Sequence, residues 1–390
     1  ANVATGTFTL TGAGAISDAA ATTIGNGIPM GALVFTAGGA ITLNDNAGDV
    51  INVTGNATFS NGGISTVTIG PAGVANFGSL TVGGTTVTVQ EDSATTLAGA
   101  NVASGVFTLT SAGAIDDAAG ASIGNGTPVG SLIFTAAGAI TLNDNAADVM
   151  NVTGNAFFTT GGAFAIGVGA AGTANFGSLT VNGTAVTVQE DSDSALAGAN
   201  VATGTFTLTS AGGITDNAGA SIGNGTPVGA LAFTAGGAIV LNDTGADVIN
   251  VTGNAFFSTG GGFAITVGAT GAANFGSLTV NGTTVTVQED SDTLLTGVNV
   301  ATGTFTLTSA GAVTDAVGTS LGNGTPMGAL SITAGGAITL NDTGADVINV
   351  TGNASFLTGG LFAISVGPAG AANFGSLTVN GTTVTVQEDS

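Results

Sequence analysis

The chain has no Lys, Arg, His, Cys, Trp or Tyr in 390 residues, whereas Asp and Glu together number 23. Without imidazole, thiol, amine or guanidinium groups, catalysis by these side chains is excluded. Without cysteine, no disulfide stabilises the fold. Because the formal charge is -23 and no basic side chain is present, a phosphate backbone or an anionic membrane surface would meet only like charge. We therefore expect no enzymatic activity and no nucleic-acid partner.

The strong helix formers Lys and Arg are also missing. In addition, 69 residues are Gly, which disfavours helices. Hydrophobic residues nevertheless make up 43% of the chain, which is enough for a packed interior. They occur at regular positions between glycines, so the chain is not of the disordered class. No unbroken run of about 18 apolar residues is present, so we expect no membrane insertion. The composition predicts a β-rich protein.

A unit of 99 residues recurs four times without internal insertion or deletion, and the fourth copy, 298–390, has six residues fewer. The string Val-Gln-Glu-Asp-Ser ends at Ser93, Ser192, Ser291 and Ser390. Repetition at a fixed period is typical of solenoids and arrays. We divide the chain into repeats 1–99, 100–198, 199–297 and 298–390, and expect them to form one continuous solenoid.

A shorter pattern of apolar strand, glycine corner and apolar strand recurs inside each unit. Its corners fall at Gly14, Gly39, Gly63, Gly84 and Gly113, in steps of about 20 to 30 residues, the scale of one solenoid coil. Alternation of apolar residues with Thr predicts strands with one buried face. The predicted inward residues of the first unit are Phe8, Leu10, Phe35, Ile41, Leu43, Ile51, Val53, Phe59, Val67, Ile69, Phe77, Leu80, Val82, Val87 and Val89. We expect their phenylalanines to stack in an internal column, with Phe35, Phe134, Phe233 and Ile332 in equivalent layers.

These patterns predict an all-β fold, a right-handed parallel β-helix with about four coils per 99-residue repeat. The alternative is a row of four immunoglobulin-like β-sandwich domains, since 99 residues suit such a domain. Coil-level similarity, the absence of a Trp or Tyr corner, and the lack of a charged or proline-rich linker favour the solenoid.

Two strings resemble the bacterial "β strand repeat" surface proteins, related in style to filamentous-haemagglutinin-like adhesins. They are Phe-Thr-Ala-Gly-Gly-Ala-Ile-Thr-Leu-Asn-Asp at 35–45 and Val-Ile-Asn-Val-Thr-Gly-Asn-Ala at 50–57. The resemblance extends over all four units. It implies a parallel β-helix, export to the cell surface or extracellular matrix, and a role in adhesion or extracellular structure. The strict period and the lack of basic residues depart from the usual pattern of these proteins.

Paired aspartates recur on a glycine-containing turn and are candidate Ca²⁺ ligands, because oxygen donors suit this ion. Neither an EF-hand nor a glycine-rich calcium repeat is present, and the competing interpretation is an Asx turn that ends a strand. The candidate metal-binding residues are Asp45, Asp49, Asp144, Asp148, Asp243, Asp247, Asp342 and Asp346. A second acidic group, Glu91-Asp92-Ser93 with its copies, is expected to be a solvated turn at the unit boundary. Because the same carboxylates recur in every unit, a single glycosidase-type pair is not expected.

Two further patterns offer surface chemistry. Threonines such as Thr7, Thr9 and Thr11 could order water or ice on an outer face. Asn-x-Thr or Asn-x-Ser triplets are candidate glycan acceptors in an exported chain. They occur at Asn52, Asn56, Asn125, Asn151, Asn182, Asn224, Asn250, Asn281, Asn323, Asn349, Asn353 and Asn380.

The sequence therefore predicts an exported structural protein that builds an extracellular filament, matrix or surface stalk by strand stacking. A tandem-domain adhesin that binds a surface or glycan receptor is the alternative, and a water-ordering Thr array is a third. We expect an extracellular or cell-surface location. The open ends of a solenoid predict either end-to-end self-association or continuation into a longer chain.

Overall fold

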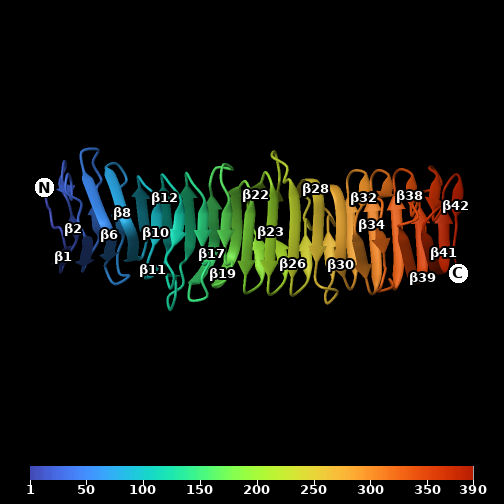
Figure 1. Cartoon of the computed structure of the whole chain (residues 1–390), viewed down its shortest axis with the longest axis horizontal. Coiled ribbons are helices and arrows are strands. Elements are labelled where there is room, and N and C mark those ends of the chain that lie inside the picture. Colours follow the sequence, from blue (N-terminus) through green and yellow to red (C-terminus); the bar gives the residue numbers. More distant parts are fainter. Residues whose placement is uncertain (390) are drawn as a thin grey trace. The chain divides into compact units, whose positions relative to one another are not determined.

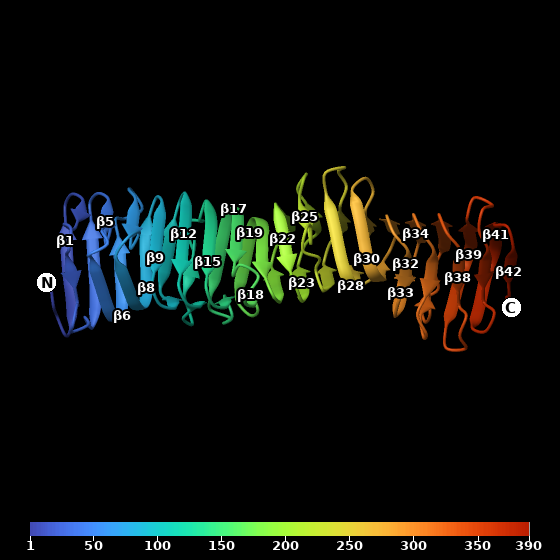
Figure 2. The same cartoon turned by 90° about the horizontal axis from the view of Figure 1, so that it is seen from above.

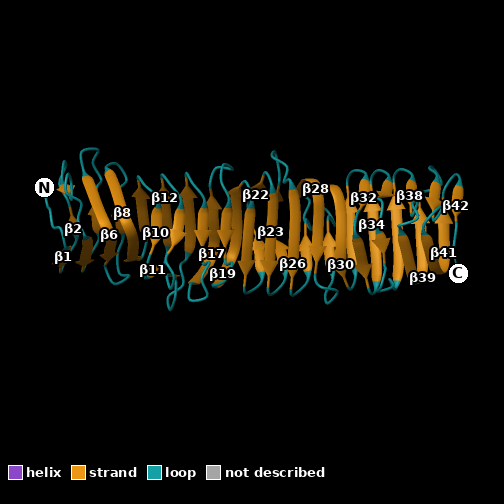
Figure 3. Cartoon of the chain, viewed as in Figure 1, coloured by secondary structure: helices purple, strands orange, loops and turns teal. Residues whose placement is uncertain are grey.

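The computed structural model describes residues 1–389, and these form an all-β parallel β-solenoid with about 16 turns, about 24 residues per turn and no helix. Figure 3 shows strands and loops throughout. Two compact units are present, Ala1–Asp191 and Ser192–Ser390. Within each unit, successive turns lie side by side in chain order (Figures 1 and 2).

The first unit contains twenty strands. They are β1 Thr7–Gly12, β2 Ile16–Ser17, β3 Thr23–Ile24, β4 Ala32–Ala37, β5 Ile41–Leu43, β6 Val50–Ser60, β7 Val67–Ile69, β8 Val74–Gly84, β9 Val87–Glu91, β10 Thr95–Leu97, β11 Ala100–Ala103, β12 Val106–Ser111, β13 Ile115–Asp117, β14 Ser122–Ile123, β15 Ser131–Ala136, β16 Ile140–Leu142, β17 Val149–Thr159, β18 Ile166–Val168, β19 Thr173–Gly183 and β20 Val186–Glu190.

The second unit begins with β21 and β22, the counterparts of β10 and β11, and then repeats the order of the first unit. Its strands are β21 Ser194–Leu196, β22 Ala199–Ala202, β23 Thr205–Ser210, β24 Ile214–Asp216, β25 Ser221–Ile222, β26 Ala230–Ala235, β27 Ile239–Leu241, β28 Val248–Ser258, β29 Ile265–Val267, β30 Ala272–Gly282, β31 Val285–Glu289, β32 Thr293–Leu295, β33 Val298–Ala301, β34 Thr304–Ser309, β35 Val313–Asp315, β36 Ser320–Leu321, β37 Ala329–Ala334, β38 Ile338–Leu340, β39 Val347–Leu357, β40 Ile364–Val366, β41 Ala371–Asn380 and β42 Val384–Val386.

Each strand pairs in parallel with the strand that follows one turn later. In the first repeat, β1 pairs with β4, β4 with the end of β6, and β6 with β8. A second stack runs through β2, β5, β7 and β9. Immunoglobulin-like sandwiches are built from antiparallel sheets. The sandwich alternative is therefore wrong, and the predicted parallel β-solenoid is confirmed.

The two stacks exchange roles at the repeat boundary. In the first unit, β12, the copy of β1, pairs with β9 of the second stack. The copy of β2, β13, joins the first stack through β10, which pairs with β8. The same exchange occurs in the second unit, where β34 pairs with β31 and β35 with β32. Within each unit, equivalent loops of successive repeats therefore emerge on opposite sides of the solenoid.

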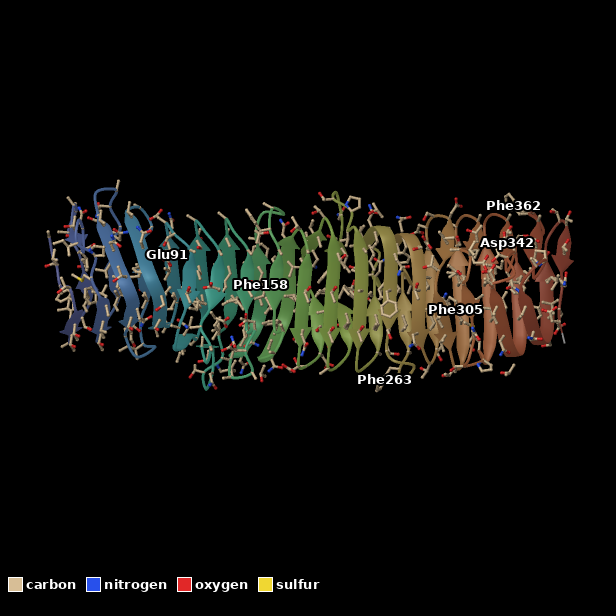
Figure 4. The ribbon with its side chains drawn as sticks, viewed as in Figure 1. Glu91, Phe158, Phe263, Phe305, Asp342 and Phe362 are labelled. Carbon is tan, nitrogen blue, oxygen red and sulfur yellow. The ribbon has the colours of Figure 1, made fainter. Side chains whose placement is uncertain are left out.

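Phenylalanine rings form the predicted internal ladder. Phe35 lies edge-on to Phe8 and Phe59, with ring centroids 5.6 and 6.0 Å apart. In the second repeat, Phe134 contacts Phe158 at 6.1 Å. Figure 4 shows Phe158 among the strands of the first unit. Edge-to-face rings at such distances add to the stabilisation from apolar burial.

Thirteen of the fifteen predicted inward residues are buried, and the exceptions both lie on β1. Leu10 is 39% exposed and Phe8 is half-buried. Their copies Phe107 and Leu109 are fully buried, because β12 has a neighbour on each side whereas β1 pairs only with β4. The predicted inward set is thus confirmed for thirteen residues, whereas Leu10 on β1 is exposed although its copy Leu109 is buried.

Candidate metal centre

Three aspartates from two adjacent turns meet at the edge of the second stack. Asp18 directly follows β2, and Asp45 and Asp49 occupy the loop between β5 and β6. Because β2 and β5 pair in parallel, both strands end at the same edge and their following residues lie together. One carboxylate oxygen from each of the three residues lies within 4.8 Å of the others.

The same cluster recurs in every repeat. Its members always combine one half-buried, one exposed and one buried aspartate. The clusters are Asp18, Asp45 and Asp49; Asp117, Asp144 and Asp148; Asp216, Asp243 and Asp247; and Asp315, Asp342 and Asp346. Figure 4 marks Asp342 at the upper edge of the second unit.

All eight candidate ligands from the sequence belong to these clusters, but sequence analysis missed the third member. The third members, one in each repeat, are Asp18, Asp117, Asp216 and Asp315. Their spacing of 99 residues was visible in the printed sequence. They were overlooked because each lies about one coil before the paired aspartates, and only parallel stacking brings it to them.

Asparagine at the end of β5 shapes the loop. Asn44 adopts φ +58°, a left-handed conformation that Asn tolerates better than most residues and that ends the strand. Its backbone N–H donates to Asp18 Oδ2 at 2.8 Å. Gly73 passes over it on the next turn, where a Cβ atom would lie 2.3 Å from Asn44 Oδ1. The turn that ends β5 and the acidic cluster are therefore parts of one structure, but the Asn44 side chain makes no hydrogen bond and so forms no Asx turn.

The buried aspartate holds the loop closed through backbone donors. Asp148 accepts the N–H of Gly120 at 2.6 Å on Oδ1 and that of Asn145 at 2.9 Å on Oδ2. It is 1% exposed. Each carboxylate oxygen has a second lone pair, so these bonds leave acceptor capacity.

The half-buried aspartate has one oxygen with no partner. Asp117 Oδ2 accepts the N–H of Asn143, whereas Asp117 Oδ1 is buried without a hydrogen bond. The same Oδ1 atom is unpartnered in Asp18, Asp216 and Asp315. Burying an unpaired carboxylate oxygen is costly. The neighbouring Asn44 and its copies also have buried Oδ1 and Nδ2 atoms without a hydrogen bond, so each site contains several unsatisfied polar atoms.

Burial and neighbouring carboxylates also disfavour the charged form. Desolvation, followed by repulsion from Asp148 and Asp144, raises the pKa of Asp117 to about 6, although the hydrogen bond from Asn143 opposes the shift. The pKa values of Asp216 and Asp315 rise to about 6 for the same reasons. Because the chain has no Lys, Arg or His, no basic side chain can offset these charges.

The second acidic group differs from its prediction. Glu91 is 1% exposed, so the expected solvated turn is wrong for this residue, although Asp92 is exposed. Glu91 Oε1 accepts the N–H of Phe77 at 2.9 Å, and Oε2 accepts the hydroxyl of Thr95 at 2.7 Å. Burial raises its pKa despite these bonds. Glu91 therefore joins neighbouring turns from inside the solenoid and is a structural residue.

The candidate glycan acceptors fall into two groups, asparagines in exposed loops and asparagines on strands. Asn125, Asn224 and Asn323 lie in exposed loops. Asn56, by contrast, donates through Nδ2 to the hydroxyls of Thr58 and Thr81 at 2.8 and 3.2 Å. The Asn56 amide is thus engaged within its own strand and with the next turn, whereas the three loop asparagines are exposed.

The threonine rows are partly regular. Thr266, Thr286 and Thr306 stack in register through β29, β31 and β34. In the first unit the equivalent row passes from Thr108 to Ile133, which is 38% exposed. Apolar interruptions of this kind disfavour a uniform water-ordering face.

A family model described as "Repeats of unknown function (DUF5649)" matches residues 1–54, 183–252 and 282–355, together about half of the chain. The chain belongs to this family. No curated protein and no solved structure matches it. These DUF5649 repeats form a parallel β-solenoid whose aspartate triads could hold metal ions such as Ca²⁺. Over residues 1–389, no helix is long and apolar enough to cross a membrane.

Proposed function

We propose that the chain is an exported structural repeat protein, a stiff element of an extracellular filament, matrix or surface stalk. One observation carries the proposal: the same parallel pairing and acidic cluster recur in each repeat, and the phenylalanine ladder recurs in the first three, with Ile332 replacing one ring in the fourth. An enzyme needs one set of reacting groups, whereas a scaffold needs many equal contacts. On this proposal the chain is not an enzyme.

Antibody accessibility in the source cells tests export and surface location. The expected result is labelling of intact cells, or recovery of the chain from the extracellular fraction. Antibodies should be raised against the exposed loops, because the chain has no lysine for amine labelling. Detection only after lysis would contradict the proposal.

An adhesive role is the second candidate, supported by aromatic side chains displayed on loops. Phe164 is 45% exposed, and the hydroxyl of Thr160 accepts from its N–H at 3.2 Å and donates to its carbonyl at 2.8 Å. Phe263 and Phe362 occupy the equivalent position at 49% and 42% exposure, on opposite edges of the second unit (Figure 4). Beads coated with the chain should lose retention on a hydrophobic or polysaccharide surface when all three become Ser.

Self-association through the open edges extends the scaffold proposal. At the internal boundary, Phe107 and Leu109 of β12 pair with Val87 and Val89 of β9. The period of 99 makes β42 the counterpart of β9, and it pairs only with β40. The β1 edge of another copy, or of a continuing chain, would meet β42 in the same register. Exposed apolar side chains at this edge are Leu377, Val379 and Val384.

Sedimentation at rising salt and Ca²⁺ tests the association of separate copies. Because a charge of -23 opposes contact, screening should shift the chain from monomer to head-to-tail polymers. A Val384→Asp variant should remain monomeric. A wild-type chain that stays monomeric at high salt and at high Ca²⁺ would instead favour a solenoid that continues within one longer polypeptide.

Calcium binding at the acidic clusters completes the proposal. Ca²⁺–oxygen distances of about 2.3 to 2.6 Å mean that opposed ligands lie roughly 4.6 to 5.2 Å apart, which matches oxygens within 4.8 Å of one another. The ion would supply the unpartnered Oδ1 of Asp117 with a partner and balance three carboxylates. It would act as a staple between turns. The test is calorimetric titration of the chelated chain with Ca²⁺ and Mg²⁺.

A further inference from the structure

Each repeat contains an exposed Asn-Gly pair on a loop between a short strand and the next long one. The pairs are Asn26-Gly27, Asn125-Gly126, Asn224-Gly225 and Asn323-Gly324. Both residues of every pair are exposed. They occupy bends without strand pairing, so neither residue contributes to the solenoid core.

Hydrogen bonds secure the loop on both sides of the pair. The N–H of Gly124 donates to Asn101 O at 2.9 Å, and that of Val129 donates to Asn151 O at 3.0 Å. Gly124 has φ +76°, and a Cβ atom there would lie 2.3 Å from Asn151 O, so the loop must begin at a glycine. Between these anchors no backbone N–H forms a hydrogen bond.

Gly126 is sterically open. Its φ is +79°, and a Cβ atom would meet nothing within 4 Å. The glycines at 27, 225 and 324 are equally open. Each of these glycines is exposed, and its backbone N–H donates no hydrogen bond to the backbone.

This arrangement permits an intramolecular reaction. The backbone nitrogen of Gly126, after losing its proton, attacks Cγ of Asn125; the new C–N bond closes a succinimide and the side-chain nitrogen leaves as ammonia. Water then opens either carbonyl of the ring to give aspartate or isoaspartate. Water is the only other reactant, and no oxidation or reduction occurs.

The Asn-Gly pairs at Asn61, Asn182 and Asn281 are held by the fold, whereas Asn380 lies exposed at the end of β41. Asn61 is 2% exposed, and its Nδ2 donates to Thr66 O at 3.1 Å. Asn182 and Gly183 lie within β19, which pairs with β17 over this segment. For such pairs to cyclise, the strand must first open, and this local opening costs free energy.

We propose that the four exposed Asn-Gly turns are sites of spontaneous deamidation, which adds one negative charge to each repeat. Complete reaction at all four turns would add four negative charges to the formal charge of -23. In a long-lived chain this modification strengthens electrostatic repulsion between copies at the loops. The inference concerns the chemistry of the folded chain and does not rest on the proposed scaffold role.

The test incubates the intact chain at mildly alkaline pH and measures aspartate and isoaspartate in peptides by mass spectrometry. Trypsin cannot be used because Lys and Arg are absent, so cleavage at Glu or Phe is required. At Asn26, Asn125, Asn224 and Asn323 the reaction should be at least about tenfold faster than at Asn61 and Asn182, since these need local opening.

Two variants supply the controls. Gly126→Ala should slow the reaction at Asn125 alone, and Asn125→Gln should abolish it there, while the other three turns react at the parental rate. Asn125→Gln should melt like the parent, whereas Gly126→Ala should melt slightly lower, because it places an alanine at φ +79°. Equal rates at exposed and strand pairs, or reaction only after unfolding, would overturn the proposal, as would a glycan on these amides in the native protein.

Discussion

At the scale of single residues, the main feature is the unbalanced negative charge of the acidic clusters. Every cluster places three carboxylates together in a chain without Lys, Arg or His. In most proteins a basic side chain would pair with such groups, but here a proton or a metal ion must neutralise them. The protonation state and the bound cation should therefore be linked.

Replacing the half-buried aspartates separates these effects. A variant with Asp18→Asn, Asp117→Asn, Asp216→Asn and Asp315→Asn should melt higher than the parent in chelator, because desolvated charges are removed. It should also lose the stabilisation by Ca²⁺. When the free Ca²⁺ concentration is 100 times the dissociation constant of a site, that stabilisation amounts to about 2.7 kcal/mol per site. Thermal melts with chelator and with Ca²⁺ provide the measurement.

Asp116→Asn is the matched control. Asp116 is exposed, adjacent to Asp117 and outside the cluster. Its replacement should leave the response to Ca²⁺ unchanged. If the control and the fourfold variant respond alike, the clusters bind no ion and act only as strand-ending turns.

Stability should depend on pH in the direction set by raised pKa values. In the folded chain the pKa of Asp117, Asp216 and Asp315 is about 6, above the ordinary value of 3.8. The folded state therefore binds protons more tightly than the unfolded state. In chelator, stability should rise as pH falls from about 7 towards 4 and should be lost as pH rises through 6.

Urea unfolding across this pH range checks the sign. Ca²⁺ should stabilise the chain at pH above 6 and have little effect near pH 4, where protons occupy the carboxylates. The fourfold Asn variant should show a flatter pH profile. A parent chain that loses stability on acidification from 7 to 5 would contradict the assignment.

Stacked strands and their ring ladder dominate at the scale of structural elements. Phe158 on β17 is fully buried and lies 6.1 Å from Phe134 and 6.0 Å from Phe176. Phe158→Ala should cost about 3 to 5 kcal/mol of unfolding free energy, since it leaves a cavity between turns. Phe164→Ala, on the exposed loop nearby, should change it by less than about 0.5 kcal/mol. Denaturant titration of both variants tests the inward assignment, and equal effects would show it to be wrong.

Sequence reasoning located the elements because alternation and glycine corners are local signals. It placed Phe35, Ile41 and Phe59 inside correctly. It could not find the contact of Asp18 with Asp45, because that contact depends on which strand ends meet across a turn. It misplaced Glu91 because a charged residue beside Asp92 is usually solvated, whereas three hydrogen-bond donors, two of them side-chain hydroxyls, receive this carboxylate inside the fold.

The exchange of the two stacks was also beyond local patterns. The step from Gly84 to Gly113 is the longest of the corner spacings. It contains β10 and β11, which carry the chain from one stack to the other. Only the register of pairing distinguishes this segment from one long coil.

At the scale of the whole molecule, the repeats are modular. Strand pairs join turns that are neighbours along the chain, so each repeat depends on its neighbours alone, as in other solenoids. Function, on our proposal, comes from the number of equal repeats. No repeat should then be indispensable for folding.

Removal of one complete repeat tests this claim most directly. Deleting residues 100–198 joins residue 99 to residue 199, a junction that reproduces the natural one between repeats. We expect the shortened chain to keep the same β-structure per residue by circular dichroism and to melt within a few degrees of the parent. Deleting 50 residues from the same region breaks the register and should prevent cooperative folding. A chain that unfolds when residues 100–198 are removed would contradict the modular account.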